Sequence, residues 1–220
     1  MATDVFPPLI GKIAKDNGGR EIGRIVSFII DSSGNVKEAL IENKSEELVR
    51  YSVERLKDDG EEVLVVSDVE RRVENLCEEL PILVKKREIL ESLFKNKEIL
   101  PEIYESLSAE FDKSINDLRV EAQSILSEVE SQIQQQENNI KMLHLARTFL
   151  EMEHGVGNVK DDVFRQSLIS ILKEIKYSSY KKMNLLKIKD KVSSIIPQSN
   201  LVFEGHTDQK SIMSVRITDK

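Results

Sequence analysis

The middle of the chain is a long stretch without glycine. Between Asp68 and Glu153 there is no glycine, and the only two prolines are Pro81 and Pro101. Both residue types interrupt helix interiors, although proline is tolerated in a first helical turn or at a kink. The stretch therefore predicts helices, with each proline at a helix start or a kink. A single helix from Ile82 to Glu153 would be roughly 110 Å long, which indicates a rod rather than a globular domain.

Apolar residues recur along this stretch about every 3.5 residues. The clearest seam runs from Ile115 to Leu150 and spans about four to five heptads, with Gln136 as a polar residue at a core position. A seam sustained over that length is typical of a coiled coil. One helix cannot bury it alone, so we expect either a second chain or a back-folded helix at residues 82–98 to cover it. The expected oligomerisation seam consists of Leu126, Val129, Ile133, Ile140, Leu143 and Leu150.

The composition agrees with long helices that carry narrow apolar seams. Charged residues make up 32% of the chain, aromatic residues only 5%, and there is no tryptophan. So few large apolar anchors disfavour the sizeable core of an enzyme. The formal net charge is −7, so bulk electrostatics also disfavour a general nucleic-acid binder.

The sequence offers no constellation for catalysis or for metal binding. His144, His154 and His206 lack the spacing of a metal-ligand pair, and Cys77 has no second cysteine as a partner. The segment 16–19 precedes a predicted strand and lacks the Lys–Ser/Thr ending of a phosphate loop, so we interpret it as a hairpin turn. We therefore predict a protein that is not an enzyme, with no catalytic, cofactor-binding or metal-binding residues and no small-molecule substrate.

The chain carries no mark of secretion or membrane insertion. A single cysteine fits a reducing cytoplasm, where disulfides are rare. Residues 1–9 lack the basic segment and apolar run of a signal peptide. No stretch approaches the roughly 20 apolar residues that a membrane-spanning helix needs. We expect a cytoplasmic protein whose membrane contact is peripheral.

Residues 1–67 are expected to form a small β-barrel. Short apolar runs alternate with turns rich in glycine, asparagine and aspartate, as in small closed sheets. The predicted strands are Leu9–Ala14, Ile22–Asp31, Val36–Glu42 and Glu61–Val66. The segment Tyr51–Leu56 is predicted to form one helical turn before the last strand.

The rest of the chain divides into three predicted parts. Residues 68–154 are the coiled coil, and the glycines at 155 and 157 break it. Residues 155–197 form a second helical region, which Pro197 is expected to end. Residues 198–220 are a flexible tail. The whole chain is thus expected to have an α+β fold, with a barrel followed by helices and a strand-like tail.

A basic segment lies in the second helical region. From Lys173 to Lys191 there are seven lysines against two acidic residues, a local charge of 7 − 2 = +5, interleaved with Tyr177 and Tyr180. Such a segment can contact nucleic-acid phosphates or an anionic membrane surface. It can equally be a solvated helix face. The candidate contact residues are Lys176, Lys181, Lys182 and Lys187.

The tail contains a short β-prone segment from Ile212 to Ile217. In an extended strand, Met213, Val215 and Ile217 would share one face. A mobile segment of this kind can add as a strand to the exposed sheet edge of a partner, with alternate side chains entering pockets. A disordered end, or a strand that docks on its own chain, is the alternative.

Two resemblances follow from these motifs. The segment from Leu9 to Asp31, with Leu-Ile-Gly-Lys-Ile-Ala and Gly-Arg-Glu-Ile-Gly-Arg-Ile-Val-Ser-Phe-Ile-Ile-Asp, resembles the opening of a PRC-barrel domain. Followed by a glycine-free coiled coil and a terminal strand, nearly the whole chain resembles the archaeal cell-division family CdvA.

The resemblance to CdvA implies a scaffold that forms filaments at mid-cell between nucleoids. It implies peripheral association with the inner face of the cell membrane and with DNA, and recruitment of an ESCRT-III-like protein by the C-terminal peptide. The positions that match the recruiting peptide are Ile212, Met213, Val215, Arg216 and Ile217.

Two other function classes remain open at this stage. The first is a nucleic-acid-binding coiled-coil protein, either nucleoid-associated or related to ribosome maturation, which the basic segment favours and the acidic remainder disfavours. The second is a chaperone-like coiled-coil holdase. An enzyme is the least favoured class.

Overall fold

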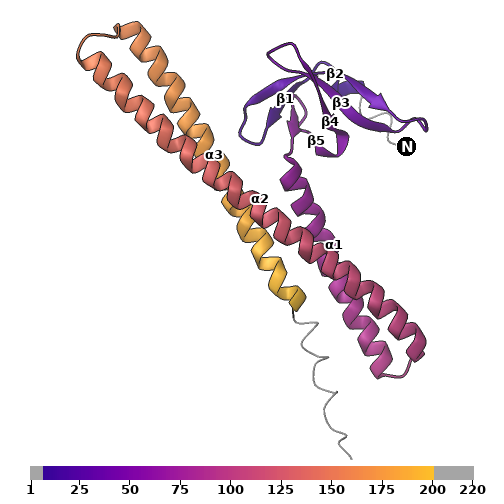
Figure 1. The fold of residues 1–220 in the computed structure, drawn as a ribbon. Coiled ribbons are helices and arrows are strands. Elements are labelled where there is room, and N and C mark those ends of the chain that lie inside the picture. Colours follow the sequence, from indigo (N-terminus) through magenta and orange to yellow (C-terminus); the bar gives the residue numbers. More distant parts are fainter. Residues whose placement is uncertain (1–6, 201–220) are drawn as a thin grey trace, which may run out of the picture. The chain divides into compact units, whose positions relative to one another are not determined.

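The fold is α+β, as predicted: a six-stranded sheet precedes three long helices (Figure 1). The computed structural model describes residues 7–200, with side chains described for residues 8–196. The sheet region comprises η1 (Pro7–Leu9), β1 (Ile13–Asp16), β2 (Glu21–Ile30), β3 (Val36–Glu42), β4 (Leu48–Ser52), η2 (Val53–Arg55), β5 (Leu56–Asp58) and β6 (Val63–Val65). The helices are α1 (Asp68–Lys95), α2 (Pro101–Gly155) and α3 (Asp161–Asn200).

The sheet has the order β4-β3-β2-β1-β6-β5, and β1 pairs with β6 in parallel while the other pairs are antiparallel. Inward-facing residues alternate along β2 and β3, so that Ile25, Ala39 and Ile41 are buried. The complete buried cluster consists of Leu9, Ala14, Ile25, Ala39, Ile41, Val63 and Val65. A small apolar core of this kind stabilises the sheet region.

The predicted strands differ from the observed ones in two ways. Strands β4 and β5 were not expected; β4 pairs along its whole length with β3, and this pairing stabilises a five-residue segment with weak alternation. The predicted strand Leu9–Ala14 begins only at Ile13, because Leu9 lies in the 3₁₀ turn η1 and fills the core. The helical turn expected at Tyr51–Leu56 is present as η2.

The start of α1 is set by a capping box. The Ser67 hydroxyl accepts the Glu70 N–H at 3.2 Å, and a Glu70 carboxylate oxygen accepts the Ser67 N–H at 3.0 Å. These two bonds satisfy backbone donors that the first turn leaves free. The helix therefore begins directly after the sheet.

The stretch from Ile82 to Glu153 is divided between two helices, and Pro101 begins the second of them, as predicted for a proline at a helix start. The Lys97 backbone has a φ of 62°, and the Glu98 N–H donates to the Leu93 carbonyl at 2.9 Å. This left-handed closure ends the first helix, and Pro101 opens the next one, as its fixed φ allows. Pro81 lies inside α1.

Helix α3 does not end at Pro197, contrary to expectation, but continues to Asn200. Proline removes one backbone donor, yet its φ of about −65° is that of a helix, so a helix near its end can pass through it. The break between α2 and α3 lies where it was expected. Gly157 has a φ of 83°, and the Asn158 N–H returns to the Glu153 carbonyl at 2.9 Å.

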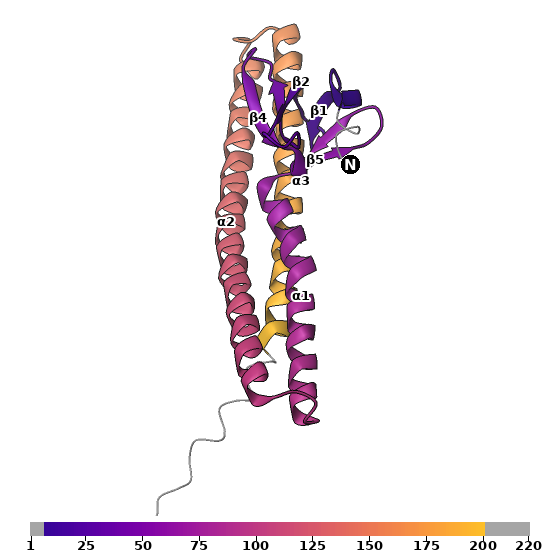
Figure 2. The ribbon, with the colours of Figure 1, turned by 90° about the vertical axis from the view of Figure 1, so that its right-hand side faces the viewer.

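The described residues group into two compact units. The first contains residues 7–74 and 127–188, and the second contains residues 75–126 and 189–200. Within the first unit, α2 and α3 form an antiparallel hairpin, which Figures 1 and 2 show side by side. Glu137 pairs with Lys182 at 2.8 Å, and the His154 ring stacks on Phe164 at 3.9 Å. The domain boundaries drawn from the sequence stay a prediction.

Candidate interaction surfaces

The turn between β1 and β2 is a contact site for α3. Asp16 Oδ1 accepts the N–H groups of Gly18 and Arg20, both at 2.9 Å, which holds the turn in shape. The Tyr177 hydroxyl donates to the other carboxylate oxygen of Asp16. The Arg20 guanidinium lies 3.5 Å from the centre of the Tyr177 ring and also pairs with Glu174. This predicted hairpin turn therefore joins the sheet to the helical hairpin.

The Tyr177 ring packs closely against the turn at Gly18. A Cβ added to Gly18 would lie 2.7 Å from Cε2 of Tyr177, so the ring needs a glycine opposite it. Burial, together with the hydrogen bond to the Asp16 carboxylate, raises the pKa of Tyr177 to about 12. The phenol therefore stays protonated, and a hydrogen-bond donor, across the physiological pH range.

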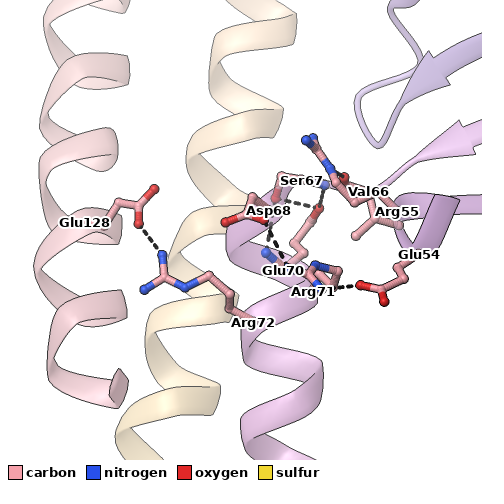
Figure 3. Close-up of polar contacts among 9 residues, drawn as sticks. All are labelled: Glu54, Arg55, Val66, Ser67, Asp68, Glu70, Arg71, Arg72 and Glu128. Carbon is pink, nitrogen blue, oxygen red and sulfur yellow. Dashed lines mark hydrogen bonds and ion pairs between the residues drawn. The ribbon is translucent and has the colours of Figure 1, made fainter. Parts of the chain in front are cut away.

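A second set of polar contacts joins the sheet to the first turns of α1 (Figure 3). Arg71 pairs with Glu54 of η2, and the Arg55 Nε donates to the Val66 carbonyl at 2.8 Å. Arg72 reaches Glu128 of α2 at 2.7 Å. These pairs are partly exposed, so each contributes modestly to stability. Together they fix the direction in which α1 leaves the sheet.

A cavity of about 340 Å³ lies beside these contacts, lined by the sheet, α1 and the hairpin. Its charged lining residues are Asp16, Arg55, Glu70 and Lys181. Three of these already make structural contacts: Asp16 binds Tyr177, Arg55 binds Val66, and Glu70 caps α1. The lining contains no histidine or cysteine. Ser67 also lines the cavity, and its hydroxyl donates to the Glu70 carboxylate at 2.9 Å as part of the cap of α1.

The described residues contain neither a candidate metal site nor a candidate membrane span. No group of three histidine, cysteine or acidic side chains in residues 7–200 is placed to hold a metal ion. No helix in that part of the chain combines the length and apolar character needed to cross a membrane. His154 instead lies 2.8 Å from Asp161 through Nε2, at the turn between α2 and α3.

The four candidate lysines do not form one patch. At 100° per residue, Lys176 and Lys187 are only about 20° apart around α3, and both are exposed. Exposed Lys173 lies on the same side; we call Lys173, Lys176 and Lys187 the lysine face. Lys182 points elsewhere and pairs with Glu137, which lowers the pKa of that glutamate. Lys181 lines the cavity.

The part of the predicted seam that lies in the helical hairpin faces α3. Val129 is fully buried, and Leu143 and Leu150 are half-buried. Leu143 lines a small hollow together with Glu174 and Ser178 of α3. Helix α3 supplies a matching stripe at alternating spacings of four and three residues. Its members are Phe164, Leu168, Ile171, Ile175, Ser178, Lys182 and Leu185, all buried or half-buried. A role of this seam in self-association stays a prediction.

One apolar surface was missed in the sequence. Met142, Leu145, Phe149, Met152 and Val156 are large, apolar and 63–72% exposed. Their spacings of three and four residues are visible in the sequence, but the stronger seam beside them obscured the pattern. The predicted partner-binding residues Ile212, Met213, Val215, Arg216 and Ile217 lie outside the described residues.

Two comparisons with known proteins agree with this architecture. The model of the CdvA-like coiled-coil domain matches residues 70–212. A protein of Sulfolobus acidocaldarius named "Cell division protein A" is 22% identical over 168 residues, covering 76% of this chain and 70% of that relative. Because the matched region includes most of the chain, with all of α2 and α3 and all but the first two residues of α1, this protein belongs to the CdvA family.

Proposed function

We propose that this chain is a non-enzymatic structural scaffold of archaeal cell division. The match of residues 70–212 to the CdvA-like coiled-coil domain carries this proposal. The named role of the similar Sulfolobus acidocaldarius protein supports it. In this proposal the chain assembles with copies of itself at mid-cell, on the inner face of the membrane, and brings an ESCRT-III-like protein there.

The recruiting element in this proposal is the C-terminal peptide. The family match ends at residue 212, so the argument for the peptide rests on its residue pattern. Three apolar side chains, Met213, Val215 and Ile217, alternate in sequence and would share one face of an added strand. Main-chain hydrogen bonds would supply affinity, and these side chains would supply specificity by filling pockets beside the sheet edge of the partner.

Val215→Asp in the full chain is expected to abolish binding to the ESCRT-III-like protein. The substitution would bury an unpaired charge, at a cost on the order of several kcal/mol, enough to remove a micromolar complex. Isothermal titration calorimetry measures the effect. Ser214→Asp is the matched control, because it adds the same charge to the opposite face and should retain most of the affinity. Undiminished affinity of Val215→Asp, or of a chain that ends at Lys210, would refute recruitment by this peptide.

The lysine face supports a second part of the proposal, contact with an anionic surface. Its three lysines are exposed, and no acidic residue pairs with them in the salt bridges of the described residues. Phosphate groups of acidic lipids or of DNA are the chemistry that such a face attracts. This observation also keeps the nucleic-acid-binding alternative open.

Lys176→Glu with Lys187→Glu is expected to reduce binding to acidic liposomes and to DNA by at least tenfold. The wild-type affinity should fall steeply with salt, because each lysine–phosphate contact releases a counterion. Co-sedimentation with liposomes and fluorescence anisotropy with DNA measure the two affinities. Lys181→Glu with Lys182→Glu makes the same change of charge away from the face and should have the smaller effect. Binding that does not change with salt, or equal effects of the two double variants, would show that another part of the chain binds the anionic surface.

A further inference from the structure

The apolar stripe on α2 lacks a cover within the described chain. It consists of Met142, Leu145, Phe149 and Met152 of α2 and of Val156, which follows directly after the end of α2; these residues are 69, 72, 63, 63 and 72% exposed. A single exposed apolar residue is ordinary on a protein surface. Five in succession, at spacings of three, four, three and four residues, have the periodicity of a coiled-coil seam. We call this surface the outer stripe.

Most of the outer stripe faces away from α3, although Met142 also lines the small hollow that contains Glu174 and Ser178 of α3. At 100° per residue, the outer stripe lies roughly 140° around α2 from Leu143 and Leu150. Those two residues are half-buried in the hairpin, whereas Leu145 and Phe149 are exposed. Helix α2 therefore carries two apolar faces, one that packs against α3 and one that is mostly exposed.

We propose that the outer stripe pairs with the outer stripe of a second copy of this chain. The pairing rests on the proposed function, in which copies of the chain assemble, and it names the surface that would join them. Met142 and Val156 are each seven residues from Phe149, whereas Leu145 is four residues and Met152 three residues from it. An antiparallel second copy centred on Phe149 would therefore bring the two Phe149 side chains together and place Met142 opposite Val156, as a two-fold interface allows.

The exposed area is sufficient for such an interface. Five large side chains, each about two-thirds exposed, offer roughly 500 Å² on one copy and roughly 1,000 Å² on two, which reaches the lower bound for a specific interface. Ala146 and Thr148 flank the stripe, and their small side chains allow a second helix to approach closely. The only charges on its flanks are Lys141 and Glu153, one on each side.

A lipid surface fits the outer stripe less well. Helices that lie in a membrane interface carry rows of lysine and arginine beside their apolar face. Here one lysine and one glutamate flank the stripe, and Glu151 lies on the same helix. Their mixed charge gives no attraction to an acidic bilayer, so a second copy is the occupant that the surface favours.

Leu145→Glu with Met152→Glu tests the pairing in the full chain. Self-association measured by sedimentation velocity is expected to weaken at least tenfold, because two charges would enter the interface from each copy. Ile169→Glu, at a residue of α3 that is 52% exposed and outside the stripe, is the matched control and should associate like wild type. Circular dichroism checks that both variants keep their helices.

A cross-link gives a second readout that does not depend on stability. Phe149→Cys in a Cys77→Ser background should form a disulfide-linked dimer under mild oxidation, whereas Ile169→Cys in the same background should not. Wild-type association of the Leu145→Glu/Met152→Glu variant, or no link through Phe149→Cys, would overturn the pairing. So would a loss of liposome binding with self-association unchanged. If the pairing fails these tests while calorimetry still shows binding of the ESCRT-III-like protein, recruitment stands. If the pairing passes while calorimetry shows no binding of the ESCRT-III-like protein, the pairing stands and recruitment is wrong.

Discussion

Gly23→Ala is expected to unfold the sheet region. A Cβ at this position would lie 2.0 Å from the backbone oxygen of Glu42 and 2.7 Å from its carbonyl carbon. Both atoms belong to the backbone of β3, so no side-chain rotation can relieve the contact. The two strands would have to separate next to the buried Ile25 and Ile41. Loss of that packing should cost at least about 3 kcal/mol, a large fraction of the stability of a small domain.

Thermal and chemical denaturation, followed by circular dichroism, measure the effect of Gly23→Ala. Gly155→Ala is the control, because a Cβ there meets nothing within 4 Å. The control should melt like wild type or slightly higher, since alanine restricts the unfolded chain more than glycine does. A Gly23→Ala protein with wild-type stability would show that β2 and β3 pair differently near Glu42.

Local patterns predicted most of the secondary structure. The apolar runs predicted the central strands, and the absence of glycine predicted the helices. Pro101 predicted the start of a new helix, but the left-handed residue that ends α1 could not be located, because a lysine in that region leaves no mark comparable to a glycine. Strand β4 was missed because its pairing with β3, rather than its own composition, makes it a strand.

The surfaces were harder to predict than the elements. Apolar periodicity indicated a seam around Val129 and Leu143, but it left open whether a second chain or a back-folded helix at residues 82–98 covers it, and it did not indicate α3. The turn at residues 156–160 brings α3 back along α2, so that α3 lies beside Leu143. The contact between Asp16 and Tyr177 joins residues 161 positions apart, and nothing in either local segment indicates it. The outer stripe was detectable by spacing alone, and only its exposure distinguishes it from core.

Asp112→Ala is expected to destabilise the second compact unit by about 3–5 kcal/mol, the cost of leaving a buried charge without its partner. Arg87 is only 2% exposed, and its Nε donates to Asp112 Oδ1 at 2.9 Å. Its Nη1 reaches the Tyr104 hydroxyl at 3.4 Å, a weaker contact that cannot replace a carboxylate. Arginine does not lose its proton at any working pH, so Arg87 cannot escape the penalty by becoming neutral. Urea denaturation measures the loss.

A second substitution, at Arg87, separates the cost of leaving the Arg87 charge without its partner from the net contribution of the Arg87–Asp112 pair to stability. Arg87→Met removes the charge and keeps much of the apolar volume, so the double variant Arg87→Met/Asp112→Ala should recover most of the stability that Asp112→Ala loses. Glu88→Ala breaks the exposed pair of Glu88 with Lys85 on the same helix and should change stability by no more than about 0.5 kcal/mol. If Asp112→Ala costs less than about 1 kcal/mol, Arg87 is reached by water. If the double variant is as unstable as Asp112→Ala alone, the loss of stability comes from the packing around Asp112 and not from the buried charge of Arg87.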